Sequence, residues 1–177
     1  MSWIQTHSGE AIDLLDPRPE KIHILDIAHS LANQARFNGH TREFYSVAEH
    51  CVFMSLQVPR LFALEALMHD AAEAYVGDVP APLKVLIGDR YRQIEQRFDH
   101  VIRQRFGVPT QGGPVVEADL RMLATEYKQL MGPSLRPWDN LDGVEPYDAK
   151  LFCWTPEEAK AVFLGRYREL QQPDLWG

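Results

Sequence analysis

The chain has 177 residues, of which 45% are hydrophobic and 24% charged, and this composition predicts one globular domain spanning residues 1–177. Its net charge of −7 argues against a protein whose main task is to grip duplex nucleic acid, because neutralising phosphates requires a basic surface. No apolar run approaches the roughly 20 residues that span a bilayer, so no membrane-spanning protein is expected. Cys51 and Cys153 lie far apart and no secretory signal peptide is recognised, so we expect reduced thiols in a cytoplasmic protein.

Residues 3–15 predict a short β-hairpin around Ser8-Gly9, and Pro17 and Pro19 then break the chain. Beyond the prolines, apolar residues recur at helical spacing. The helices that this period predicts span residues 25–37, 46–56, 61–75, 83–106 with room for a break at Gly88, and 115–131. The pattern therefore predicts an all-α bundle with a small β decoration.

The C-terminal part, residues 132–171, is predicted to form a loop followed by a helix. Three prolines and several aromatic residues in 132–154 favour an ordered loop packed by Trp138, Tyr147 and Phe152. The segment Thr155-Pro156-Glu157-Glu158 has the pattern of a capping box, which predicts the start of the last helix.

Three of the predicted helices carry ionisable side chains on the side expected to face the core: His50, the adjacent pair His69-Asp70, and Asp119. Apolar residues on the same faces are Val47 and Met54 for His50, and Val115, Val116, Met122 and Leu123 for Asp119. Burying such groups costs free energy unless something compensates, and a divalent cation held by all four side chains would give a neutral site. Mixed nitrogen and oxygen ligands suit Mn, Co, Zn, Fe or Ni, with Mg as an alternative.

The order His, His-Asp, Asp on successive helices resembles the HD-domain phosphohydrolases. The resemblance covers residues 26–126 and includes Arg36-Phe37-Asn38-Gly39-His40, His69-Asp70-Ala71-Ala72-Glu73, and residues 77–84. These segments look like the nucleotide-acting branch, which includes bacterial 5′-deoxynucleotidases and phage dATP triphosphohydrolases. The resemblance implies an HD-domain helical bundle, one divalent metal ion, a small nucleotide substrate and a homo-oligomer. Residues 38–42 depart from the deoxynucleotidase pattern, which leaves the exact substrate open.

Two further carboxylates are candidates for catalysis. Glu73 follows His69 by four residues and Asp70 by three, so it shares their helix face and is placed to act as a general acid or base. The alternative for Glu73 is an exposed helix glutamate. Asp78 follows Gly77, where it can orient water or a sugar hydroxyl, or merely cap the next turn.

Three residues are candidates for binding the substrate. The guanidinium of Arg36 suits phosphate oxygens, and the resemblance also places this arginine at the phosphate. By the same resemblance Phe37 lies near the sugar. Lys84 can hold a distal phosphate, and a solvated lysine is the alternative. His29 is interpreted as a structural residue, and His7 is assigned no role.

The sequence thus predicts a metal-dependent phosphohydrolase, with release of phosphate from a deoxynucleoside monophosphate as the first choice. Release of triphosphate from a deoxynucleoside triphosphate is the alternative, because one metal site serves both reactions. A non-catalytic nucleotide-binding module is the rival from another class. The presence of Glu73 and Arg36 beside a full ligand set argues against this rival, since a pure binder needs no poised acid.

Overall fold

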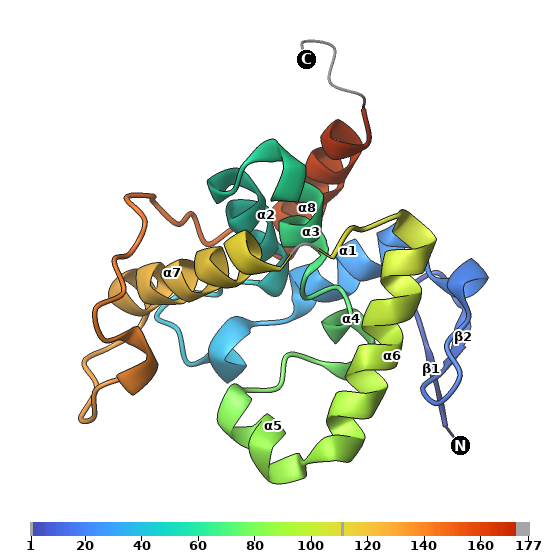
Figure 1. Ribbon diagram of the computed structural model, residues 1–177, viewed down its shortest axis with the longest axis horizontal. Helices are drawn as coiled ribbons and strands as arrows, with labels where there is room; N and C mark the ends of the chain where they lie inside the picture. Colours follow the sequence, from blue (N-terminus) through green and yellow to red (C-terminus); the bar gives the residue numbers. More distant parts are fainter. Residues whose placement is uncertain (1, 111, 173–177) are drawn as a thin grey trace.

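The computed structural model describes residues 2–110 and 112–172 and shows a mainly α-helical fold with a short N-terminal hairpin (Figure 1). The antiparallel hairpin pairs β1 with β2, with Ile4 opposite Ile12. The strands and α-helices are β1 (Trp3–Gln5), β2 (Ala11–Asp13), α1 (Ile24–Asn33), α2 (Val47–Gln57), α3 (Arg60–Met68), α4 (Glu73–Val76), α5 (Ala81–Ile87), α6 (Asp89–Phe106), α7 (Gly113–Leu130) and α8 (Pro156–Gln171). Both the predicted fold class and the predicted hairpin are confirmed.

Helix α2 is the central element, and α1, α3, α7 and α8 all pack against it (Figure 1). Its residues from Val47 to Ser55 are all buried, which is why its polar members, including His50, lie inside the molecule. Ser46 caps this helix, since its hydroxyl accepts a hydrogen bond from the Glu49 amide. Thr155 and Glu158 form the predicted capping box at the start of α8.

Helix α1 ends at Asn33, so the prediction of a helix through residue 37 was wrong for its last turn. The chain leaves the helix because its backbone pairs with the segment before α2: the Arg36 amide donates to the Tyr45 carbonyl, and the Val47 amide to the Gln34 carbonyl. Phe37 and Asn38 then adopt left-handed backbone angles, with φ of 54° and 52°. This conformation costs a non-glycine residue about 1 kcal/mol or more, so the surrounding structure must hold it in place.

The predicted helix over residues 61–75 is also interrupted, and the interruption falls at the His-Asp pair. Helix α3 ends at Met68, and α4 begins at Glu73. In between, amides bond three residues back rather than four, as from Ala71 to Met68 and from Glu73 to Asp70. This tighter turn changes the direction in which the side chains of residues 69–73 project.

The predicted break at Gly88 is confirmed, since this residue separates α5 from α6 with a φ of 83°. Helix α5 stands out from the body of the molecule beside α6 (Figure 1). Its Lys84 turns back toward α4 and α6, whereas Leu86 is 82% exposed.

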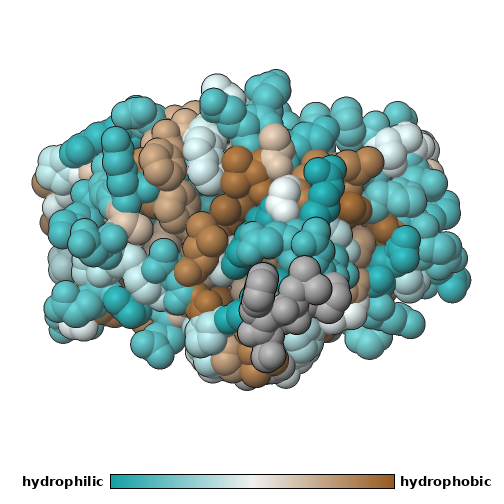
Figure 2. Space-filling view, turned by 90° about the horizontal axis from the view of Figure 1, so that it is seen from above, coloured by the Kyte–Doolittle hydropathy of each residue, from teal (hydrophilic) through white to brown (hydrophobic). Residues whose placement is uncertain are grey.

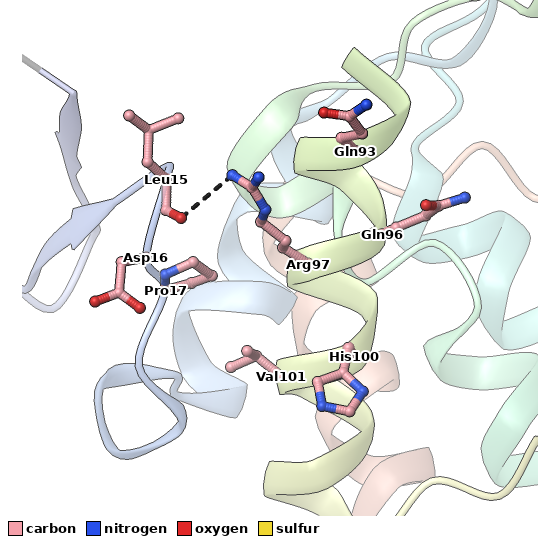
Figure 3. A pocket seen from close by; sticks show the side chains of 8 residues that line it. All are labelled: Leu15, Asp16, Pro17, Gln93, Gln96, Arg97, His100 and Val101. Atoms are coloured by element: carbon pink, nitrogen blue, oxygen red, sulfur yellow. Dashed lines mark hydrogen bonds between the residues drawn. The ribbon is translucent and has the colours of Figure 1, made fainter. Parts of the chain in front are cut away.

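The hairpin is fixed to the helices at two places. The Ser8 amide and hydroxyl both donate to the Asp26 carboxylate of α1, each at 2.7 Å. After β2, Arg97 of α6 reaches the Leu15 carbonyl oxygen at 3.3 Å, at the edge of a hollow of about 540 Å³ (Figure 3).

The face shown in Figure 2 is largely hydrophilic, with apolar residues gathered near its middle. Leu61 and Val116 are two large apolar side chains that lie at the surface, with exposed fractions of 66% and 69%. Within residues 2–110 and 112–172, no helix has the length and apolarity needed to cross a membrane.

The predicted loop over residues 132–154 is packed by two of the three expected aromatic side chains. Trp138 lies on Tyr127 with ring centroids 4.9 Å apart, and the Tyr147 ring lies 4.1 Å from the Arg121 guanidinium. Phe152 differs, because it stacks at the surface near Phe53 and stays 58% exposed.

The end of this loop is held by the buried carboxylate of Glu49. It accepts the backbone amides of residues 152, 153 and 154 at 2.9, 3.0 and 2.7 Å. Glu49→Gln should lower stability by about 2 kcal/mol, because an amide nitrogen then faces backbone donors. A fall in melting temperature of about 4 to 8 °C is expected for a chain of this size. Differential scanning calorimetry checks this against Glu117→Gln on the surface of α7, and equal melting temperatures would contradict it.

Candidate metal centre

Four predicted ligands come together where α2, α3 and α7 meet. His50 projects from the middle of α2, and His69 and Asp70 lie in the tight turn after α3. Asp119 comes from α7, where its side chain is half exposed. The predicted buried stripe around Asp119 was wrong at Val116, which points to solvent, so Asp119 approaches the histidines from the rim rather than from the core.

The ligand atoms of these residues are close enough to share one ion. The two Nε2 atoms of His50 and His69 are 3.3 Å apart, and Asp119 Oδ1 lies 3.3 Å from the first and 4.0 Å from the second. Asp70 Oδ2 lies 3.2 Å from His69 Nε2 and 3.8 Å from His50 Nε2. Ligands about 2.1 Å from a common metal are separated by about 3.0 Å at a right angle and about 3.4 Å at a tetrahedral angle. The His50, His69 and Asp119 group could therefore hold a metal ion.

Hydrogen bonds at the far side of each imidazole set its tautomer. His50 Nδ1 lies 2.6 Å from the Glu126 carboxylate, and His69 Nδ1 lies 2.8 Å from the Ala66 carbonyl oxygen. A carbonyl oxygen only accepts, so His69 Nδ1 donates, and the Glu126 carboxylate likewise favours a proton on His50 Nδ1. Each neutral ring then presents a lone pair on Nε2. Two such lone pairs facing each other at 3.3 Å need a cation or an extra proton between them.

The surrounding charges fit a cation at this point. Burial opposes ionisation of Asp70, but His69, His50 and Arg36 outweigh it and hold the pKa of that carboxyl below its usual range. Burial and Arg36 lower the pKa of His50. Glu126 and Asp119 raise this pKa by a larger amount, so the net shift is upward. The site thus stabilises positive charge between its imidazoles and keeps its carboxylates ionised.

Arg36 and Glu126 form a layer behind the ligands. Glu126 is fully buried on α7, and its second oxygen accepts from Arg36 Nη2 at 3.0 Å and Nε at 3.2 Å. The remaining terminal nitrogen, Nη1, lies 3.6 Å from Asp70 Oδ2. Arg36 thus contacts Glu126, which holds His50, with two of its nitrogens and faces Asp70 with the third. It therefore supports both His50 and Asp70.

Phe37 follows Arg36 in the strained turn, and its ring lies 5.3 Å from the guanidinium carbon. On its other side the Trp138 ring lies 5.9 Å away. The structure therefore brings the predicted sugar-side residue next to the arginine and adds an aromatic neighbour from the 132–154 loop.

Glu73 is 6% exposed, and its Oε2 has no hydrogen-bond partner in the described parts of the chain. Its other oxygen lies 3.6 Å from Lys84 Nζ, which also contacts Glu95 at 2.6 Å. Burial, together with Asp70 and Asp78, raises the pKa of Glu73 to about 9. The expectation of an exposed helix glutamate is thereby excluded, and Glu73 holds a proton at neutral pH.

The turn that carries Glu73 and Asp78 is fixed by Gln34 of the segment after α1. The Gln34 amide nitrogen donates to the Glu73 carbonyl at 3.0 Å, and its oxygen accepts the Asp78 amide at 2.9 Å. Burial raises the pKa of Asp78, although Arg36 opposes the shift. Asp78 is thus a partly buried carboxyl on the Arg36 side of the site rather than a simple cap.

Comparison with known proteins places the chain among relatives without an assigned activity. It is 43% identical over 174 residues to the uncharacterized protein YfdR of Escherichia coli, covering 97% of each chain. The chain belongs to this family. The uncharacterized protein RCAP_rcc00048 of Rhodobacter capsulatus is 35% identical over 191 residues, covering 96% of this chain and 95% of its own. No protein-family model matches the chain.

Glu126 and Gln34 were missed by the sequence analysis. Glu126 follows Asp119 by seven residues, which is two helical turns, and follows the buried Met122 by four. A second carboxylate on the ligand face of one helix is therefore a signal that the sequence contains. Gln34 gives no comparable signal, because its role depends on α1 ending at Asn33.

The raised pKa of Glu73 predicts a pH dependence of stability in the metal-free protein. An unfolded chain releases this proton near pH 4.5, whereas the folded protein keeps it up to about pH 9. The folded state binds more protons in that range, so this group makes stability fall as pH rises from about 4.5 to 9. Glu73→Gln removes the contribution, so its melting temperature should gain on wild type as pH rises from 5 to 8. Histidine titrations occur in both proteins, so the difference isolates Glu73, and a constant difference would contradict the shift.

Proposed function

We propose that this protein is a metal-dependent phosphohydrolase of the HD-domain type that acts on the phosphate of a small nucleotide. The observation that carries the proposal is the convergence of two Nε2 lone pairs at 3.3 Å, with Asp70 and Asp119 oxygens beside them. Each imidazole is oriented by a hydrogen bond at its other nitrogen, which is typical of metal-binding histidines.

His50, His69, Asp70 and Asp119 would hold the ion, and two neutral imidazoles with two carboxylates balance a divalent charge. A divalent cation bound there would polarise a phosphoryl oxygen and lower the pKa of water. Mixed nitrogen and oxygen donors favour Mn, Co, Fe, Ni or Zn.

Positive charge for the phosphate would come from two side chains, Arg36 beside Asp70 and Lys84 beside Glu73. Arg36 keeps Nη1 on the Asp70 side, while its other nitrogens are engaged by Glu126. Lys84 is 24% exposed and lies beside Glu73, within reach of a phosphate that approaches from solvent. Phosphoryl transfer depends mainly on positioning and charge neutralisation, which these two cations would provide.

Glu73 is proposed to donate the proton that the leaving oxygen needs. Its side chain is buried, burial and the neighbouring Asp70 and Asp78 raise its pKa, and one of its oxygens has no hydrogen-bond partner in the described structure. Such a group is costly to keep in a module that only binds, because an unsatisfied buried oxygen lowers stability without aiding recognition. Asp78, across the turn held by Gln34, would orient water or a sugar hydroxyl.

The nucleoside part of the substrate is proposed to lie toward Phe37, whose ring is next to Arg36, and toward Trp138, whose ring is next to Phe37. Aromatic rings suit a nucleobase or the apolar face of a deoxyribose. We propose a deoxynucleoside monophosphate as the first substrate to test, with deoxynucleoside triphosphates as the alternative because the same metal site serves both.

A panel of nucleoside mono- and triphosphates, in ribo and deoxy forms, tests the proposal in the presence of Mn, Co, Mg or Zn. Products are separated by chromatography, so orthophosphate and triphosphate release are distinguished. We expect metal-dependent orthophosphate release from at least one deoxynucleoside monophosphate, absent in His69→Ala. Triphosphate release alone would replace the substrate, and no hydrolysis with any metal would contradict the enzyme assignment.

A further inference from the structure

A second polar hollow, of about 420 Å³, lies between the N-terminal hairpin, α1 and α4. None of its lining residues belongs to the metal ligands. It is lined by Ile4, Gln5, Thr6, His7, Asp26, His29, Ser30, Asn33, Gln34, Ala74 and Tyr75. The hollow is therefore separate from the metal centre, although Gln34 and Ala74 connect it to the turn that carries Glu73.

Two histidines line this hollow, and a lysine of α8 lies beside one of them. The rings of His7 and His29 stack with centroids 3.7 Å apart and planes at 12°. Lys160 of α8 places Nζ 3.4 Å from His29 Nδ1. The nearby Asp26 carboxylate is already engaged by the amide and hydroxyl of Ser8. Stacked imidazoles beside an ammonium group lose stability as soon as they protonate, unless an anion joins them.

Tyr75 supplies an independent sign of a ligand. It is 6% exposed, lines the hollow and stacks on Phe98 with ring centroids 4.8 Å apart. Its hydroxyl has no hydrogen-bond partner among the residues that the structure describes. Buried hydroxyls are normally paired, because leaving one unpaired costs about 1 to 3 kcal/mol. The hydroxyl oxygen is itself enclosed, so a polar ligand in the hollow would satisfy it once the wall beside it moves slightly.

We propose that this hollow is a second binding site, for a small anion that carries a phosphate group. The imidazoles of His7 and His29 and the ammonium group of Lys160 would neutralise the anion, and the Tyr75 hydroxyl would donate to one of its oxygens. Orthophosphate is the simplest member of this class.

An anion bound in the hollow would influence the metal centre through hydrogen bonds that connect the two. The Ser30 hydroxyl donates to the Ala74 carbonyl at 3.0 Å and accepts from the Gln34 amide at 2.9 Å. The same Gln34 holds the Glu73 carbonyl and the Asp78 amide. An anion in the hollow would thus contact residues that, through Gln34, position Glu73, the proposed proton donor.

Binding at this site should depend on pH. Burial, His7 and Lys160 lower the pKa of His29, while Asp26 and Glu157 oppose them. A bound anion reverses the balance and favours the protonated ring, so phosphate should bind more tightly at pH 6 than at pH 8.

Proton NMR of the histidine rings, during titration of the wild-type protein with orthophosphate, tests the proposal directly. We expect the His7 and His29 signals to shift with a common dissociation constant. The double variant His29→Gln with Lys160→Met should raise that constant at least tenfold, as measured by calorimetry, and Tyr75→Phe should raise it about fivefold. Lys150→Met, an exposed lysine, is the matched control and should leave it unchanged.

Two results would overturn the proposal. Unmoved His7 and His29 signals at millimolar phosphate would show that no anion binds there. Loss of their shifts in Arg36→Ala, with retention in the double variant, would assign the binding to the metal centre. Neither readout requires turnover, so the outcome is independent of whether the phosphohydrolase proposal holds.

Discussion

Glu126→Gln is expected to weaken metal binding by 10- to 100-fold and to lower stability by about 3 kcal/mol, the effects typical of losing a supporting carboxylate and of breaking a buried ion pair. The wild-type carboxylate joins His50 Nδ1 at 2.6 Å to the Arg36 guanidinium at 3.0 Å, with all its surface buried. Glutamine keeps the shape but removes the closer of the two carboxylates beside Arg36 and leaves only Asp70, at 3.6 Å. It also allows His50 to turn its protonated nitrogen toward the ligand position.

Metal titration by calorimetry and urea unfolding measure the two effects on one preparation. Glu117→Gln is the matched control, because it removes a glutamate from the exposed face of the same helix. If Glu126→Gln binds metal like the wild type, the carboxylate does not set the His50 tautomer. A large stability loss with unchanged metal affinity would reduce Glu126 to a partner of Arg36 alone.

Glu73→Gln is expected to lower the turnover number by about 100-fold or more while leaving metal content and nucleotide affinity near wild type. The residue is not among the four proposed ligands, and its free oxygen and raised pKa suit proton donation. Glutamine preserves the side-chain size and the hydrogen-bonding capacity but transfers no proton. Removal of the costly buried carboxyl should also make the metal-free variant more stable at pH 8.

Single-turnover rates, metal content and nucleotide binding are to be measured together, with Glu20→Gln as an exposed control. Full turnover in Glu73→Gln would remove Glu73 from the mechanism. Lost metal would instead make it a ligand. The combination of retained binding and lost turnover is what separates an enzyme from a nucleotide-binding module.

Much of the fold follows from local signals in the sequence. The capping box at Thr155 and the break at Gly88 both appear where local chemistry predicts them. The early end of α1 and the tight turn at His69 do not, since both depend on contacts with distant segments. In α1 the decisive contact is backbone pairing with residues 45–47, which no helical period reveals.

The site was predictable where residue type and spacing coincide. His50, His69 and Asp70 meet inside the molecule, on α2 and the turn after α3, and Asp119 reaches them from the rim of α7. Arg36 was expected only at the phosphate, and its bonds to Glu126 show a supporting role as well. The stacking of His7 on His29 joins the hairpin to α1 across the fold, and for that reason neither residue stood out in the sequence.

Metal content after removal of all metal with a chelator and dialysis against Mn tests the central claim most directly. Elemental analysis should find one ion per chain in the wild type and in the control variant His100→Ala. His100 lies on α6 and lines a different hollow. His69→Ala should bind far less than one. Equal metal content in all three proteins would contradict the assignment of His50, His69, Asp70 and Asp119 as a metal centre.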